Sequence, residues 1–307
     1  GVTAFNLGHH DGVIAIGGGS ALDAGKAIAL MARQGISIWE LEDVGDNWTR
    51  ADVAGIAPIV AVPTTAGTGS EVGRASVILD EAERVKKIIF HPKMVPAIVI
   101  LDPMVTTGLP PMLTAATGMD ALSHSLEAWC SPVYHPMAEG IAVEGMRLVR
   151  EYLPAAVASG SDVEARTQML VASMMGATAF QRGLGAMHAL AHPLGALYNA
   201  HHGTLNAVLM PYVLIANRQA IEPRIIRLAK SIDIPNAGFD SFLDWVLELR
   251  ETVSIPQNLE DLGIDDSQAD LIGKMAEVDP SSGTNPILFD ASQYQSVFMN
   301  ALNGNLS

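Results

Sequence analysis

Two segments of the chain carry histidine and aspartate at the spacing of metal ligands on helices. Asp120 and His124 are four residues apart, and so are His188 and His192, so each pair would project from one face of a helix. A His-His-Gly triplet follows at 201–203. Burying this many imidazoles in a mainly apolar region costs free energy unless their nitrogen atoms find a common partner. A bound metal ion would be such a partner.

The donor types restrict which metal could bind. One carboxylate with three imidazoles offers borderline donors without sulfur, which suits Fe(II), Zn(II), Co(II) or Mn(II) rather than Ca(II) or Mg(II). Cys130 is the single cysteine, so neither a thiolate cluster nor an intrachain disulfide can form. The HExxH motif of metalloproteases does not occur. Spacing alone leaves open whether His188 or His192 is the ligand.

A glycine-rich turn at 17–20 lies between a predicted buried strand at 13–16 and a predicted amphipathic helix at 21–33. Glycines at such a turn let backbone N–H groups approach a phosphate, and the helix N-terminus adds positive potential. Ser20 is expected to cap the helix, with Asp23 three residues later. The turn matches neither the GxGxxG fingerprint nor the Walker A pattern. It is therefore a candidate phosphate cradle of another kind.

A second loop, at 63–71, is rich in threonine, serine and glycine and follows a predicted strand at 56–62. A further strand is predicted at 97–101. The carboxyl ends of parallel strands meet at one edge of a sheet, which is where open α/β sheets bind ligands. The two loops together predict a nucleotide site at that edge.

The chain is expected to divide near residue 108. Residues 1–108 alternate short apolar runs with helical patterns, which is typical of a parallel sheet with crossover helices. Residues 109–307 carry 3.6-residue periodicity and few strand signals. We expect an α/β dinucleotide-binding domain followed by an all-α domain. The predicted helices of the second domain lie near 112–130, 136–152, 163–182, 184–198, 204–217, 239–252 and 266–277.

Composition excludes several classes of protein. The chain has 33 acidic and 18 basic residues, a formal net charge of −15, which repels the phosphate backbone of nucleic acids. No apolar run approaches the roughly 20 residues that a membrane helix needs, and no signal-peptide pattern opens the chain. We expect a cytoplasmic protein that binds neither nucleic acid nor membrane.

Four segments of the sequence resemble the iron-containing (group III) alcohol dehydrogenase family. The matching segments are GGGSALDAGKAIAL at 17–30, PTTAGTGSEV at 63–72, ATGMDALSHSLEAW at 116–129 and HALAHPLGALYNAHHG at 188–203. They occur in family order across both predicted domains. The resemblance implies the dehydroquinate synthase-like architecture of this family, with a parallel dinucleotide-binding sheet, an all-α C-terminal domain and a catalytic metal in the cleft between them.

The resemblance also implies roles for individual residues. It makes Asp120, His124, His188 and His202 the metal ligands, and it leaves His192 as a catalytic residue near the substrate. The cofactor contacts that it implies, on the pyrophosphate, the nucleotide and the nicotinamide side, are Gly18, Gly19, Ser20, Asp23, Thr64, Thr65, Thr68 and Leu113.

The function that follows is an NAD- or NADP-dependent alcohol dehydrogenase or aldehyde reductase. Hydride would pass between nicotinamide C4 and a small alcohol or aldehyde bound to Fe(II), or alternatively Zn(II), and the protein would form a homodimer or larger homo-oligomer. The alternatives are a glycerol dehydrogenase-like or dehydroquinate synthase-like branch of the same fold, a non-haem iron oxygenase, and a non-catalytic paralogue. Two cofactor loops disfavour the oxygenase, and filled ligand positions disfavour the paralogue.

Two features depart from the family pattern. Family members begin with an additional strand-helix unit before the segment that opens here, and that unit supplies the residue that discriminates NAD from NADP. The choice of cofactor therefore stays open. The second departure is Gly25, where many relatives carry alanine; it is expected to weaken its helix by up to about 1 kcal/mol.

Overall fold

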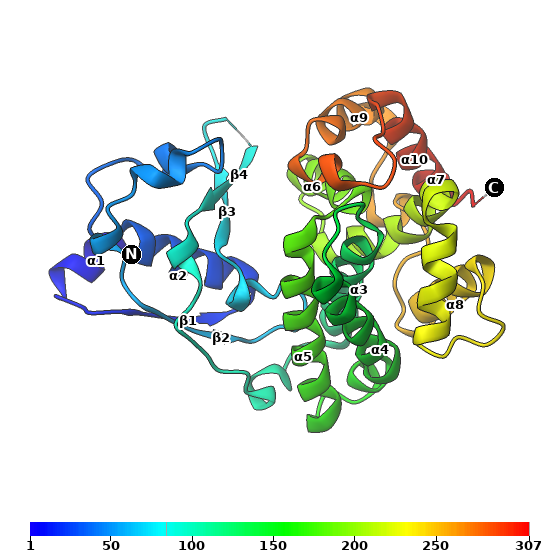
Figure 1. Cartoon of the computed structure of the whole chain (residues 1–307), viewed down its shortest axis with the longest axis horizontal. Helices are drawn as coiled ribbons and strands as arrows, with labels where there is room; N and C mark the ends of the chain where they lie inside the picture. Colours follow the sequence, from blue (N-terminus) through cyan, green and yellow to red (C-terminus); the bar gives the residue numbers. More distant parts are fainter. Residues whose placement is uncertain (84, 307) are drawn as a thin grey trace.

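The computed structural model describes residues 1–83 and 85–306, and it consists of an α/β part and a helical part (Figure 1). The α/β part is coloured blue to cyan, and the helical part runs from green to red. This arrangement confirms the predicted fold class. The expected division near residue 108 falls between the last strand and the first long helix. In the described part of the chain, no helix is both long and apolar enough to cross a membrane.

The α/β part is built on a parallel three-stranded sheet. Its strands are β1 (Val13–Gly17), β2 (Ile59–Pro63) and β5 (Ile98–Val99), in the order β1-β2-β5. β1 and β2 pair in register over five residues, from Val13 opposite Ile59 to Gly17 opposite Pro63. The strands therefore end together, and the loops that follow β1 and β2 lie at the same edge of the sheet. All three strands were predicted, although β2 and β5 are shorter than expected.

One face of this sheet is covered by helix α2 (Gly19–Met31). Ala15, Leu22 and Ala61 are buried together between the helix and the sheet. The short helix α1 (Val2–Leu7) adds Phe5 to a second small cluster beside α2. On the opposite face of the sheet the side chains of Ile14, Ile16, Ile98 and Ile100 are exposed.

Helix α2 begins at Gly19, two residues earlier than the sequence analysis predicted. Gly18 is the N-cap of α2, its carbonyl accepts from the N–H groups of Ala21 and Leu22, and Ser20 lies inside the first turn with its side chain exposed. The expectation that Ser20 caps the helix was therefore wrong. A Cβ at Gly25 would lie 2.5 Å from the Cβ of Ala15. Glycine at this position thus lets α2 approach β1 closely.

An antiparallel hairpin, which the sequence analysis did not predict, extends from the α/β part. Its strands are β3 (Ala75–Asp80) and β4 (Val85–Phe90). Charged residues interrupt the apolar alternation of β4, so its strand signal is weak. Short 3-10 segments complete this part of the chain, at Ile38–Leu41, Asn47–Arg50, Val53–Gly55, Ser70–Val72, Pro92–Met94 and Pro103–Thr106.

The helical part buries one large apolar core. Its helices are α3 (Pro111–Cys130), α4 (Pro136–Ala158), α5 (Val163–Ala179), α6 (Ala186–Tyr198), α7 (His202–Ser231), α8 (Phe239–Thr252), α9 (Ala269–Glu277) and α10 (Ala291–Asn303). Every residue of α3 from Thr114 to Cys130 is buried, which makes α3 the central helix. The 3-10 segments here are Phe180–Arg182, Glu260–Leu262, Asp266–Gln268 and Pro280–Thr284.

The predicted helices of this part are present, with two differences. α7 continues to Ser231 rather than ending near 217, although Pro211 and Pro223 lie within it. Packing against other helices stabilises α7 at these prolines, which by themselves would favour ending the helix. α10 was not predicted. It begins with a capping box formed by Asp290 and Gln293.

Candidate functional site

Side chains from three helices meet at the predicted metal site. α3 contributes Asp120 and His124, α6 contributes His188 and His192, and His202 is the first residue of α7. One ligand atom each from Asp120, His188 and His202 lies within 4.8 Å of the other two. Residues separated by up to 82 positions in the chain are thus brought to one point.

The two remaining histidines flank this group. The His124 ring stacks on His188 with 4.9 Å between ring centroids, and its Nε2 lies 4.0 Å from Asp120 Oδ1. The His192 ring stacks on His202 at 5.5 Å. Of the two histidines that spacing left open, His188 lies in the group and His192 lies beside it. The geometry therefore favours His188 as the ligand.

Burial and charge set the protonation of the group. Burial alone would raise the pKa of Asp120, but the neighbouring His124, His202 and His188 lower that pKa to about 2. Burial holds the pKa values of His188 and His202 well below the usual value for histidine. Burial therefore favours neutral imidazoles at His188 and His202, the form in which histidine binds metals.

Asn206, which the sequence analysis missed, lies at the centre of the group. Its Nδ2 is 2.9 Å from Asp120 Oδ1, 3.1 Å from His188 Nε2 and 3.2 Å from His202 Nε2. The signal that could have found it is its position one helical turn after His202.

Two further carboxylates, which the sequence analysis did not single out, contact the histidines. Glu127 Oε2 lies 2.6 Å from His188 Nδ1, and Asp279 Oδ2 lies 2.8 Å from His192 Nδ1. Burial raises the pKa of Glu127 to about 7, against the opposing effect of backbone N–H donors. Each histidine of α6 thus has its own carboxylate partner.

His192 and Asp279 border a cleft of about 630 Å³. The hairpin lines one side of it, with Lys86 and Lys87, and helices α6 and α9 line the other. This volume lies within the range of sites that bind small molecules, about 300–1,000 Å³. The His192 side chain is 28% exposed, so it can contact both a molecule in the cleft and solvent.

The two predicted cofactor loops lie against each other at the edge of the sheet. Thr64 N donates to Gly17 O at 2.9 Å. A Cβ at Gly19 would lie 2.6 Å from Thr68 Cγ2, and one at Gly18 would lie 3.4 Å from Thr65. Glycine at 18 and 19 therefore keeps the backbone of this turn open beside the second loop, as a phosphate cradle requires.

The Asp23 carboxylate bonds to neighbouring segments of the α/β part. Its Oδ1 accepts from Ser70 Oγ at 2.6 Å and its Oδ2 accepts from Val77 N at 3.0 Å. The buried ammonium group of Lys26 lies 3.2 Å from Asp23 and donates to Ser70 O at 3.0 Å. These bonds connect α2 to the second loop and to the hairpin. A cofactor contact of Asp23 stays a prediction.

The other predicted cofactor residues lie near these loops or at the start of α3. Ser20 is exposed on the first turn of α2, and Thr64 is partly exposed after β2. Leu113 is 38% exposed on the first turn of α3. Their contacts with a cofactor stay predictions.

Family models match most of the chain. A model described as iron-containing alcohol dehydrogenase matches residues 1–103, and one described as the C-terminal part of the Fe-containing alcohol dehydrogenase family matches residues 114–302. The chain belongs to the iron-containing alcohol dehydrogenase family. The resemblance drawn from the four sequence segments is thereby confirmed.

Curated relatives of this family member are dehydrogenases. It is 39% identical to 4-hydroxybutyrate dehydrogenase of Cupriavidus necator, over 93% of this chain and 76% of the relative. It is 38% identical to alcohol dehydrogenase 4 of Saccharomyces cerevisiae, over 94% and 75%, and 35% identical to 1,3-propanediol dehydrogenase of Citrobacter freundii, over 98% and 78%. The chain is accordingly an alcohol oxidoreductase.

Solved structures of the family share its fold. The crystal structure of a 1,3-propanediol oxidoreductase superimposes with a TM-score of 0.92 at 33% identity, covering 98% of this chain and 79% of that one. The structure of sulfoacetaldehyde reductase from Bifidobacterium kashiwanohense in complex with NAD+ superimposes with a TM-score of 0.89 at 30% identity, covering 98% and 78%.

Proposed function

We propose that this alcohol oxidoreductase binds one divalent metal ion through Asp120, His124, His188 and His202. The observation that carries the proposal is the convergence of Asp120, His188 and His202 within 4.8 Å, from three different helices. The donors fit such an ion, since one carboxylate with three imidazoles suits Fe(II), with Zn(II) as the alternative. The buried carboxylate gains a counter-charge when a cation binds.

The nicotinamide cofactor, NAD or NADP, would lie along the two loops at the sheet edge. Gly18, Gly19 and Ser20 would hold its pyrophosphate at the N-terminus of α2. Thr64, Thr65 and Thr68 present hydroxyl groups from the neighbouring loop, and these would bind the nucleotide. Leu113, at the start of the helix that also carries Asp120, would pack on the cofactor.

The reaction would interconvert a small alcohol and its aldehyde. The metal would supply Lewis acidity at the alcohol oxygen, and the nicotinamide would accept or return the hydride. Asp120 and the histidines orient the reactants in a largely buried site, which reduces the entropic part of the barrier.

His192 is the residue that we expect to move the proton. Oxidation of an alcohol releases a hydroxyl proton as well as a hydride, and an imidazole can carry it near neutral pH. When the Nδ1–H of His192 donates to Asp279 Oδ2, the Nε2 atom of His192 is left to accept that proton. The exposed edge of His192 then passes it to solvent.

Metal analysis combined with a substrate panel tests the proposal. We expect anaerobically purified protein to contain a divalent metal and to oxidise NADH or NADPH with short aldehydes, including those related to butanediol and propanediol. His188→Ala and His202→Ala should lose both metal and turnover, whereas His192→Ala should keep the metal and lose turnover. Full activity of metal-free His202→Ala protein would contradict the proposal.

A further inference from the structure

Glu127 lies behind the proposed metal ligands rather than among them. It follows Asp120 by seven residues, about two turns of α3, so the two carboxylates share nearly the same face of the helix. Its side chain is 4% exposed. Its Oε2 lies 2.6 Å from His188 Nδ1 and accepts from Gly185 N at 2.9 Å, and its Oε1 accepts from Met187 N at 2.7 Å.

The surroundings of His188 fix which ring nitrogen carries the proton. Asn206 Nδ2 donates to Asp120 Oδ1 at 2.9 Å, so the NH2 end of this amide faces the ligand group. The same Nδ2 lies 3.1 Å from His188 Nε2. Since an NH2 group only donates, His188 accepts at Nε2 and donates its Nδ1–H to Glu127.

We propose that Glu127 is a positioning residue for metal binding: it holds His188 in the Nδ1–H form and directs the Nε2 lone pair toward the ion. The inference rests on the proposed metal function. A carboxylate that accepts from the second ring nitrogen of a ligand histidine orients the ring and raises the basicity of the ligating nitrogen. Two backbone N–H donors keep the Glu127 carboxylate itself in place.

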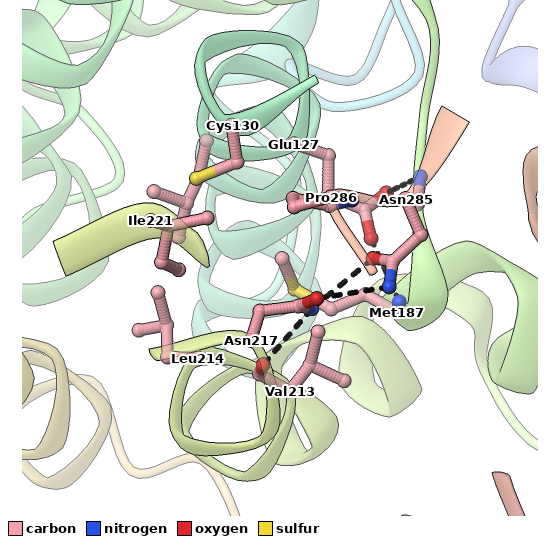
Figure 2. Close-up of a pocket in the computed structure, with 11 residues that line it drawn as sticks. Glu127, Cys130, Met187, Val213, Leu214, Asn217, Ile221, Asn285 and Pro286 are labelled. Carbon is pink, nitrogen blue, oxygen red and sulfur yellow. Dashed lines mark hydrogen bonds between the residues drawn. The ribbon is translucent and has the colours of Figure 1, made fainter. Parts of the chain in front are cut away.

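Glu127 also caps a helix, and a test has to separate that role from positioning. The N-cap of α6 is Gly185, which has no side chain to accept hydrogen bonds. Glu127 accepts from Gly185 N and Met187 N, and Asn285 Oδ1 accepts from Ala186 N at 3.1 Å. Figure 2 shows Glu127 and Asn285 lining one small cavity, of about 10 Å³, which has room for about one water molecule. Loss of capping alone would lower stability without changing the tautomer of His188.

The first experiment compares Glu127→Gln with the unsubstituted full chain. Glutamine has the same shape, but its NH2 group would face a hydrogen-bond donor that now faces a carboxylate oxygen. When the NH2 group faces His188 Nδ1, the proton of the imidazole ring has to move to Nε2. We expect Zn(II) and Co(II) to bind about 10- to 100-fold more weakly in chelator competition. The matched control is Glu139→Gln, which removes the negative charge that pairs with Arg182 and Arg224 and should lower stability while leaving metal affinity unchanged.

A second measurement needs no variant to fold. In the unsubstituted protein loaded with Zn(II) and labelled with ¹⁵N-histidine, NMR should show His188 protonated at Nδ1 with Nε2 bound to the metal. Unchanged metal affinity of Glu127→Gln, or His188 unprotonated at Nδ1, would overturn the positioning role alone. A parent protein that binds neither Zn(II) nor Co(II) would overturn the proposed metal function and this inference with it.

Discussion

Asp279 bonds at once to a histidine and to the backbone of its own loop. Its Oδ2 lies 2.8 Å from His192 Nδ1, while its Oδ1 accepts from Ser281 N at 2.8 Å as the cap of a 3-10 segment. One carboxylate oxygen therefore contacts the histidine and the other caps the 3-10 segment. The cap holds the carboxylate in the orientation that His192 requires.

Asp279→Asn should separate these tasks. Asparagine keeps an oxygen for the cap but can place its NH2 group against His192 Nδ1, which disfavours proton acceptance at Nε2. We expect kcat to fall by up to about 100-fold with the metal retained, as measured by steady-state kinetics and metal analysis. Asp265→Asn is the control, because Asp265 also caps a 3-10 segment but contacts none of these histidines. Unchanged kcat in Asp279→Asn would contradict the proton-transfer role of the pair.

Glu71 makes stability depend on pH. Burial raises its pKa to about 7, against the opposing effects of a backbone hydrogen bond and of Lys26, and its Oε1 has no hydrogen-bond partner among the described residues. The folded state therefore holds the Glu71 proton to higher pH than the unfolded state does. The stability contribution is complete below the unfolded value near 4.5 and is lost as pH rises through about 7.

Glu71→Gln removes this dependence. Relative to the parent, the variant should gain up to about 3 kcal/mol of unfolding free energy between about pH 4.5 and pH 8. Urea denaturation at several pH values measures the difference. Glu248→Gln, which removes an exposed carboxyl of α8, is the control for a change at the surface. An equal effect of Glu71→Gln at every pH would show that burial does not govern this carboxyl.

At the scale of elements, close packing of α2 positions both of the proposed cofactor loops. Gly25 lets the helix lie against β1, and Asp23 and Lys26 on the same helix bond to the second loop and the hairpin. A shift of α2 away from the sheet would therefore disturb the turn at 17–20 and the loop at 63–71 together.

Gly25→Ala should destabilise the protein even though alanine favours helices. The added Cβ would lie 2.5 Å from Ala15 Cβ, and such overpacking costs about 1–3 kcal/mol against a propensity gain of about 1 kcal/mol. Gly140→Ala on α4 is the matched control, because a Cβ there meets nothing within 4 Å and should stabilise by up to about 1 kcal/mol. Denaturant unfolding of both variants gives the comparison, and equal stabilisation would contradict the packing role.

At the scale of the whole molecule, the proposed site joins three helices that pack in one core. α3, α6 and α7 each supply a proposed ligand, so an ion there would cross-link segments that are distant in the chain. The same core contains α6 and α9, which line the cleft on the side opposite the hairpin. Binding of a metal ion and the global stability of the protein should therefore be coupled.

Chelation should lower the melting temperature. An ion present at about 1,000 times its dissociation constant stabilises the folded state by about 4 kcal/mol, which corresponds to about 6 °C for a chain of this size. Differential scanning calorimetry with and without chelator measures the shift. The melting temperature of His188→Ala should not change when chelator is added. If chelator leaves the melting temperature of the parent protein unchanged, the result would argue against a bound ion.

Local sequence determined much of this protein. Spacing of four residues places Asp120 with His124, and His188 with His192, on single helix faces, because helical geometry depends only on neighbours. Strand-turn patterns likewise identified the parallel strands and the two loops at their edge. The weak strand signal of the hairpin and the prolines of α7 were misleading, because contacts with other elements decide those segments.

Only the tertiary structure decided which side chains meet. Glu127 bonds to His188 across 61 positions, and Asp279 bonds to His192 across 87. Such pairs leave no periodic mark in the sequence, because each partner alone resembles an ordinary polar residue of its helix or loop. The sequence therefore determined the types of donor and their helix faces, whereas packing of α3, α6 and α7 decided that His188 lies among the proposed ligands and His192 faces the cleft.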